Sequence, residues 1–244
     1  MASHGAAPGK LSSNTFPSYY WVIVGTCFIL QLTSMGFGRY AYPMLLPSMQ
    51  DSLGVTYGPM GALGTVNLVG YLVFSLVSGV LATRYGAKIV TVGSMILVGL
   101  AMVSLCFVSA YWVAFGIMLL AGMGTAGVFT PAAGLGRAWA PPNLGGFTMG
   151  FLSTGVSGGM VIAAFFIPVV LTSQGAEGWR YAWVYLGVAA LVVTGLGVVA
   201  LKERRSSANP GAPAVAASSL SWGHVFRNPT IVGRQLLLDE AARS

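Results

Sequence analysis

Residues 59–82 read PMGALGTVNLVGYLVFSLVSGVLA, a run without one charged side chain. A helix needs roughly 20 apolar residues to cross the hydrocarbon core of a bilayer, and this run is long enough to do so. A turn with the sequence Thr83-Arg84-Tyr85-Gly86 follows it directly. The sequence therefore predicts that residues 59–82 form a membrane-spanning helix that ends at this turn.

Five further runs of similar length and composition lie on either side of this one. Short segments with turn-forming residues separate them, and connections this short force neighbouring helices to run antiparallel. The expected fold class is therefore all-α, a polytopic membrane protein with six transmembrane helices. The predicted spans are residues 19–46, 59–82, 89–110, 112–136, 146–171 and 182–201.

The composition of the whole chain agrees with a lipid environment. Charged residues make up 7% and hydrophobic residues 55% of the 244 residues, whereas an ordinary soluble domain has about 25% and 45–50%. A disordered chain would need low hydrophobicity, but the mean hydropathy is +0.77. The 34 glycines fit a helix bundle in lipid, where small residues let backbones approach closely. The lipid bilayer is thus the first expected partner.

The net charge of +7 does not indicate a nucleic-acid partner, because the basic residues lie in short segments between spans and form no patch with interleaved aromatics. Cytoplasmic loops of membrane proteins carry an excess of Lys and Arg. A cytoplasmic N-terminus leaves only Arg180 outside, with Arg39 in or near the first span. We therefore expect a multi-pass protein of the cell (inner) membrane with a cytoplasmic N-terminus. The inside residues are then Lys10, Arg84, Lys88, Arg137, Lys202, Arg204 and Arg205.

Three regions follow from this topology. Residues 1–18 are expected to form a cytoplasmic N-terminal tail, and residues 19–201 the six-helix bundle. Residues 202–244 begin as a linker rich in Ser, Ala and Pro. They continue as a lead-in to a seventh helix that leaves the apolar pattern at about Gly233, as a truncated or frameshifted gene would.

The sequence offers little for catalysis or metal binding. Cys27 and Cys106 lie inside apolar runs, where packing as small residues is the expected role, and His4 and His224 lie in polar flanks. An enzyme would need an acid, base, nucleophile or metal set that converges on one place. We expect no enzymatic activity, no cofactor and no metal site.

Arg39 is the most informative single residue, because apolar sequence lies on both sides of it. An arginine at a helix centre costs about 2.5–3.5 kcal/mol on insertion scales. One interpretation is that Arg39 faces a cavity and recognises an anionic group of a substrate. The other is that it reaches the membrane interface, since it follows Tyr19 by about 30 Å along the helix, or that it makes a structural bond. Both interpretations stay open.

Other polar residues in the spans could line a substrate path together with Arg39. The alternative for each is a bond across helices or to a carbonyl of its own helix, worth about 0.6 kcal/mol. All five acidic residues lie in loops or tails, so a proton relay built on membrane carboxylates is not supported. The substrate-path candidates are Arg39, Tyr40, Tyr42, Gln31, Asn67 and Thr130.

Glycines mark a faint internal repeat. The first span contains Gly36-Phe37-Gly38 with Pro43 after it, and the fourth contains Gly122-Met123-Gly124 with Pro131 after it. Such a spacing is what a 3+3 inverted repeat of a transporter half would show. The fifth span carries packing glycines that predict close contact with a neighbouring helix. These are Gly146, Gly150, Gly155, Gly158 and Gly159.

The segment 79–88, Gly-Val-Leu-Ala-Thr-Arg-Tyr-Gly-Ala-Lys, resembles the loop between helices 2 and 3 of the major facilitator superfamily, a Gly-x-Leu-Ala-Asp-Arg-x-Gly-Arg-Lys pattern. The resemblance implies a cytoplasmic latch that breaks during transport. In this chain it would comprise Gly79 for helix packing, Thr83 as a helix cap, Arg84 and Lys88 as cations, and Gly86 for the turn. Thr83 stands where the family usually has Asp.

The resemblance extends over all six spans. The runs 36–47 and 178–183 look like the YbfB/YjiJ-type bacterial branch of that superfamily. The family fold has twelve helices in two halves, so the resemblance implies that this chain covers the N-terminal half. The implied function is secondary active transport of a small molecule, possibly anionic, by alternating access, with the chain incompetent alone because the missing C-terminal half is a needed partner. The alternatives are a second copy that rebuilds the transporter as a homodimer, and a non-transport membrane scaffold.

Overall fold

The structure is a computed structural model that describes residues 19–141 and 143–201. The predicted tail 1–18 and the predicted linker and lead-in 202–244 lie outside the described residues. Within them the secondary structure is helical without strands, and six helical stretches are long and apolar enough to span a membrane. The all-α expectation and the six predicted spans are therefore confirmed.

The first span consists of three pieces and the others of one helix each. It runs from Tyr19 to Leu53, and each of the other five agrees with a predicted run to within a few residues. The pieces of the first span are α1 (Tyr19–Gln31), η1 (Leu32–Phe37) and α2 (Ala41–Leu53). The remaining helices are α3 (Tyr57–Tyr85), α4 (Ala87–Leu105), α5 (Tyr111–Trp139), α6 (Gly145–Gln174) and α7 (Gly178–Ala200), with a short 3-10 turn η2 (Gly175–Glu177) before α7.

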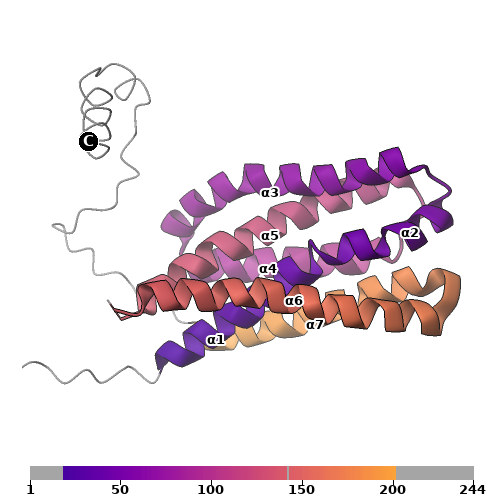
Figure 1. Cartoon of the computed structure of the whole chain (residues 1–244). Helices are drawn as coiled ribbons and strands as arrows, with labels where there is room; N and C mark the ends of the chain where they lie inside the picture. The colour runs from indigo at the N-terminus through magenta and orange to yellow at the C-terminus, as the bar shows by residue number, and fades with distance from the viewer. Residues whose placement is uncertain (1–18, 142, 202–244) are drawn as a thin grey trace, which may run out of the picture. The chain divides into compact units, whose positions relative to one another are not determined.

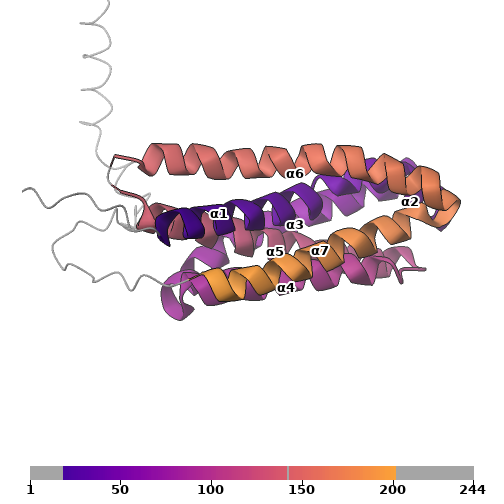
Figure 2. The same ribbon diagram turned by 90° about the horizontal axis from the view of Figure 1, so that it is seen from below.

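The helices lie lengthwise beside one another (Figures 1 and 2). Helix α5 packs against α3 on one side and α4 on the other, and α4 packs in turn against α7. The first span contacts α5, α6 and α7. It therefore lies at the centre of the bundle, and it is the most buried of the six spans.

The first span is interrupted where the sequence predicted one continuous helix. Its backbone changes from α to π winding over η1 and then makes a turn at Gly38, Arg39 and Tyr40 before α2 begins. The amides of both Arg39 and Tyr40 donate to the carbonyl of Met35, at 3.2 and 3.3 Å. A widened turn of this kind inside a helix is rare and commonly marks a functional position.

Glycine contacts explain why the interruption is tolerated. A Cβ built on Gly36 would overlap the Cα of Gly159 in α6, and one built on Gly159 would overlap the carbonyl of Leu32. Here the two backbones touch directly, without side chains between them. Only glycine permits that approach.

The two Gly-x-Gly pairs occupy corresponding places in the bundle. Gly36 of the first pair packs on α6, the middle helix of the second three-helix set. Gly122 of the second pair packs on the Asn67 carbonyl in α3, the middle helix of the first set. The helix that carries each Gly-x-Gly pair thus packs on the middle helix of the other three-helix set, as a 3+3 repeat predicts.

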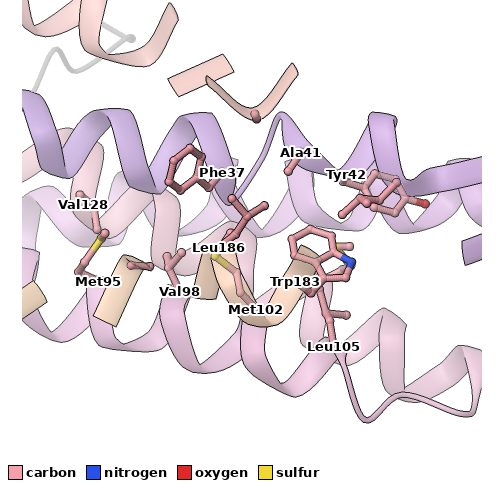
Figure 3. Close-up of a cluster of buried hydrophobic side chains, with 14 of the residues drawn as sticks. Phe37, Ala41, Tyr42, Met95, Val98, Met102, Leu105, Val128, Trp183 and Leu186 are labelled. Carbon is pink, nitrogen blue, oxygen red and sulfur yellow. The ribbon is translucent and has the colours of Figure 1, made fainter. Parts of the chain in front are cut away.

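The interior of the bundle is apolar and closely packed. Figure 3 shows Phe37, Ala41 and Tyr42 of the first span facing residues of α4 and α7. Trp183 at the start of α7 is 1% exposed, and its indole N–H donates to the Met49 sulfur at 3.4 Å. Lipid tails are as apolar as these side chains, so the bundle is held by van der Waals contact and interhelical hydrogen bonds.

Polar contacts fasten both ends of the bundle. At the Tyr19 end, the Tyr19 hydroxyl donates to the Ala200 carbonyl at 2.6 Å, and the Tyr20 hydroxyl lies 2.7 Å from the Thr148 hydroxyl. At the other end, Arg180 donates to the Cys106 carbonyl just past α4 at 2.6 Å and pairs with Glu177. A cation at a helix C-terminus satisfies carbonyls that have no partner in the helix.

Substituting Gly159→Ala should destabilise the protein, because a methyl group there must separate α6 from the first span. Overpacking of this kind costs about 1–3 kcal/mol, which corresponds to a lower midpoint of thermal unfolding, by roughly 2–10 °C. The midpoint can be measured in detergent by intrinsic tryptophan fluorescence.

Gly158→Ala is the matched control, because its Cβ would meet only the Leu32 Cδ1 at 3.8 Å, an ordinary contact. Equal midpoints for the two variants would contradict the glycine contact between η1 and α6.

Candidate functional site

The interruption in the first span lies at the mid-depth of the bundle. Gly38 packs on Thr125, which is the central residue of the 29-residue helix α5. Gly36 packs on Gly159, which lies at the centre of the 30-residue helix α6. Because both neighbours are long enough to cross the membrane, the turn at residues 38–40 falls near the membrane midplane.

The depth of the turn also sets the depth of Arg39, which is part of it. Its guanidinium carbon lies 4.7 Å from the centre of the Tyr71 ring, and Tyr71 is the central residue of the 29-residue helix α3. This mid-depth position favours the cavity interpretation of Arg39 over the interface interpretation, because the helical first span continues to Leu53 rather than ending soon after Arg39. The choice between the two stays a prediction.

The charge of Arg39 is not balanced within the described residues. The two acidic residues of the described bundle are Asp51 and Glu177, and Glu177 pairs with Arg180. Asp51 follows Arg39 by about 18 Å along α2. Arg39 therefore has an aromatic face for a partner but no carboxylate.

Two tyrosines lie near Arg39. Arg39 and Tyr40 both lie within electrostatic range of the Tyr71 hydroxyl, and all three side chains are partly exposed. The cation–π contact stabilises Arg39 by roughly 0.5–2 kcal/mol. We call this group the Arg39 site and define it as Arg39, Tyr40 and Tyr71. It presents five N–H donors and two phenol hydroxyls.

Nothing in the sequence singles out Tyr71. It lies in a run of apolar residues on α3, remote in sequence from Arg39, and tyrosine is common in membrane spans. Only the packing of α3 beside the interruption brings the ring under the guanidinium.

Two predicted path residues form hydrogen bonds to neighbouring helices. Tyr42 is 6% exposed and its hydroxyl donates to the Met60 carbonyl in α3. Asn67 is 6% exposed and its amide donates to the Met118 carbonyl in α5 at 3.1 Å. Both side chains thus join neighbouring helices, which is the alternative that the sequence left open for them.

The remaining path candidates lie apart from the Arg39 site. Gln31 is 1% exposed and lies on α1, about 12 Å along the helix from Arg39. Thr130 is partly exposed on α5, about 7 Å beyond Thr125. The structure therefore brings Arg39 and Tyr40 together and places Gln31 and Thr130 at another depth.

Two residues of the predicted latch loop have local roles in the described part of the chain. Arg84 lies over the ring of its neighbour Tyr85 at 5.6 Å, and Gly86 has the positive φ of +96° that the turn between α3 and α4 requires. Lys88 is partly buried at the start of α4.

Two expected details of the loop are wrong. Thr83 does not cap a helix, because its hydroxyl donates back to the Val80 carbonyl at 2.8 Å and Gly86 is the N-cap residue of α4. Gly79 does not serve close packing, because a Cβ there would meet nothing within 4 Å among the described residues.

Comparison with known proteins gives a consistent result. The family model described as Major Facilitator Superfamily matches residues 27–238. The chain is 27% identical to the hexuronate transporter of Bacillus subtilis over 187 residues, covering 74% of this chain and 42% of that protein. It is 26% identical to the probable sulfoacetate transporter SauU of Cupriavidus necator over 145 residues, with 59% and 33% covered.

A third relative matches almost the whole chain. The 4-hydroxybenzoate transporter PcaK of Pseudomonas aeruginosa is 24% identical over 240 residues, which cover 93% of this chain and 52% of that protein. The chain thus spans between a third and about a half of the length of these curated relatives. All three are transporters by name.

Tyr42→Phe should lower the free energy of unfolding by about 0.6–1.5 kcal/mol, because it removes the bond to the Met60 carbonyl. Tyr57→Phe should leave it unchanged, since Tyr57 is 69% exposed. Thermal unfolding in detergent gives both values. If Tyr42→Phe has no effect on unfolding, the hydroxyl does not fasten α2 to α3.

Proposed function

This chain belongs to the Major Facilitator Superfamily, and we propose that it supplies half of a secondary active transporter that moves a small organic anion by alternating access. Its named relatives are transporters, which supports transport as the general activity. The six apolar helices support a multi-pass membrane protein. The proposal goes beyond these findings in the anionic substrate, in alternating access and in the division into two halves.

One observation carries the choice of an anion. Arg39 lies at the mid-depth of α3, α5 and α6 without a carboxylate partner among the described residues. A charge at that depth is costly, and such residues face a wet cavity and mark substrate pathways. The guanidinium is permanently charged, and its planar set of N–H donors has no carboxylate partner among the described residues. This set matches the geometry of a carboxylate or sulfonate.

The relatives agree with this chemistry. A hexuronate, sulfoacetate and 4-hydroxybenzoate are organic acids that carry at least one anionic group at neutral pH. In the proposed site, Arg39 binds that group and the Tyr71 ring holds the guanidinium in place. Tyr40 and Tyr71 supply hydroxyls for polar groups on the remainder of the substrate.

A complete translocation path needs a second wall opposite the Arg39 site. Substrates of transporters built from repeats bind near the midplane where two repeats meet. We propose that a second six-helix segment supplies this wall. A second copy of the chain is the alternative.

We further propose that the N-terminus is cytoplasmic in the cell (inner) membrane, because of the Lys and Arg bias. We also propose that the loop 79–88 is the latch on the cytoplasmic side.

The assignment to the YbfB/YjiJ-type branch stays a prediction from residues 36–47 and 178–183.

Arg39→Gln should weaken binding of an organic anion by roughly thirtyfold or more, since loss of one partner of a desolvated charge pair costs about 2–5 kcal/mol. Arg39→Lys should restore only part of the affinity, because Lys lacks the planar fork. Titrations of the purified protein with sulfoacetate, 4-hydroxybenzoate and glucuronate, followed by tryptophan fluorescence, measure these affinities.

Arg137→Gln is the matched control, because Arg137 is an exposed residue in the last turn of α5, away from the midplane. Anion binding that survives Arg39→Gln unchanged, or falls equally in Arg137→Gln, would contradict the proposed role of Arg39.

Liposomes that contain only the 244-residue chain should show no saturable uptake of the bound anion, because one wall of the path is absent. Radiolabelled substrate provides the measurement, and chemical crosslinking in the same liposomes reports whether copies associate. Saturable uptake by chains that do not associate would show that the six helices suffice.

A further inference from the structure

Arg39 is the single cation at mid-depth among the described residues. The other basic side chains of this part of the chain lie in the first or last turn of a helix. They are Arg84, Lys88, Arg137 and Arg180. A substrate with two anionic groups would bring the second group to a place where the described bundle offers no positive charge, and burying a charge without a partner is costly. The site therefore favours a substrate with one anionic group.

Helix α3 forms one wall of the site beside Arg39. Four residues border Tyr71 on the surface of this helix, because residues three and four apart are neighbours. They are Asn67, Leu68, Phe74 and Ser75. Asn67 donates to a carbonyl of α5, and the ring of Phe74 lies against α5. The side of Tyr71 that faces away from α5 is therefore bordered by Leu68, which is 39% exposed, and by the exposed hydroxyl of Ser75.

Helix α6 forms the opposite wall. The first span contacts α3 through α2 and α6 through η1, and the turn with Arg39 connects these two pieces. Gly159 of α6 meets the first span between Leu32 and Gly36. The first and fifth spans run in the same direction, so Arg39 lies level with about residues 162–166 of α6. These residues read Ile-Ala-Ala-Phe-Phe and include no polar side chain.

The side chains next to Arg39 border one wet space, because a guanidinium at this depth is costly in lipid and faces a cavity. Apolar side chains form most of this border, and its polar groups are the hydroxyls of Tyr40, Tyr71 and Ser75. A substrate with several hydroxyls, such as a sugar acid, would leave most of them without partners among the described residues. Each such group weakens binding by roughly five- to 100-fold. An apolar body instead gains free energy by leaving water.

We propose that the Arg39 site takes a monocarboxylate with a compact apolar body, a narrower substrate class that rests on the proposed function, and that Ser75 binds a hydroxyl at the far end of this body. Ser75 follows Tyr71 by about one turn, roughly 6 Å along α3. A carboxylate bound to Arg39 above Tyr71 thus leaves the opposite end of an aromatic ring within reach of Ser75. The Ser75 hydroxyl donates to the Leu72 carbonyl, and its own lone pairs accept from the substrate.

The test is isothermal titration calorimetry of the purified chain with benzoate, 4-hydroxybenzoate, glucuronate and the dianion terephthalate. Benzoate and 4-hydroxybenzoate should bind at least about tenfold more tightly than the other two. The para hydroxyl should strengthen binding by about two- to tenfold over benzoate, the effect of one hydrogen bond. Ser75→Ala should remove this advantage and leave the affinity for benzoate unchanged.

Ser153→Ala is the matched control. Ser153 is an exposed serine that also bonds its own helix, at the Met149 carbonyl. It precedes the level of Arg39 on α6 by at least about 14 Å. The variant should keep the wild-type ratio of the affinities for 4-hydroxybenzoate and benzoate.

The outcomes separate this proposal from the proposed function. A wild-type ratio of the two affinities in Ser75→Ala would overturn the role of Ser75, and glucuronate or terephthalate binding as tightly as benzoate would overturn the substrate class. In both cases loss of binding in Arg39→Gln would leave the proposed function intact. If none of the acids binds, or if Arg39→Gln binds them as the wild type does, the proposed function falls and this proposal falls with it.

Discussion

The bundle depends on one backbone contact at its centre, where Gly36 of the first span meets Gly159 of α6. Because no side chain separates the two helices, the first span can widen into η1 and turn at Gly38 without opening a gap. The same close approach fixes the depth of the turn, since Gly159 and Thr125 are central in their own helices. The positions of Arg39, Gln31 and Ser34 all follow from this contact.

Charge and polarity are distributed unevenly around the interruption. On one side Arg39 lies over Tyr71, partly exposed and without a carboxylate among the described residues. On the other side Gln31, Ser34 and Thr91 are buried with unpaired atoms. Both arrangements cost free energy in a protein held mainly by van der Waals contact. The proposed anion site accounts for the first of these arrangements.

Much of the local structure was predictable. Five of the six apolar runs became spans within a few residues, and the first span extends seven residues further, to Leu53. A backbone in hydrocarbon must satisfy its hydrogen bonds internally, so a long apolar run has only the helix available. The glycine pairs predicted a repeat, and the contacts of Gly36 and Gly122 agree with it. The wrong predictions concerned which residues of other helices lie opposite a given side chain. Thr83 was expected to cap a helix and Gly79 to pack closely, and neither does so, because each role depends on what lies opposite the residue.

The sequence by itself determined the class of the protein, its spans and the importance of Arg39. These follow from local quantities, namely the transfer cost of a charge and the length of an apolar run. Only the tertiary structure decided that Arg39 lies at the mid-depth of α3, α5 and α6 and that Tyr71 is its partner. These depend on the register between helices remote in sequence, and that register is set by close contacts between small residues, which hydropathy along a single chain does not record.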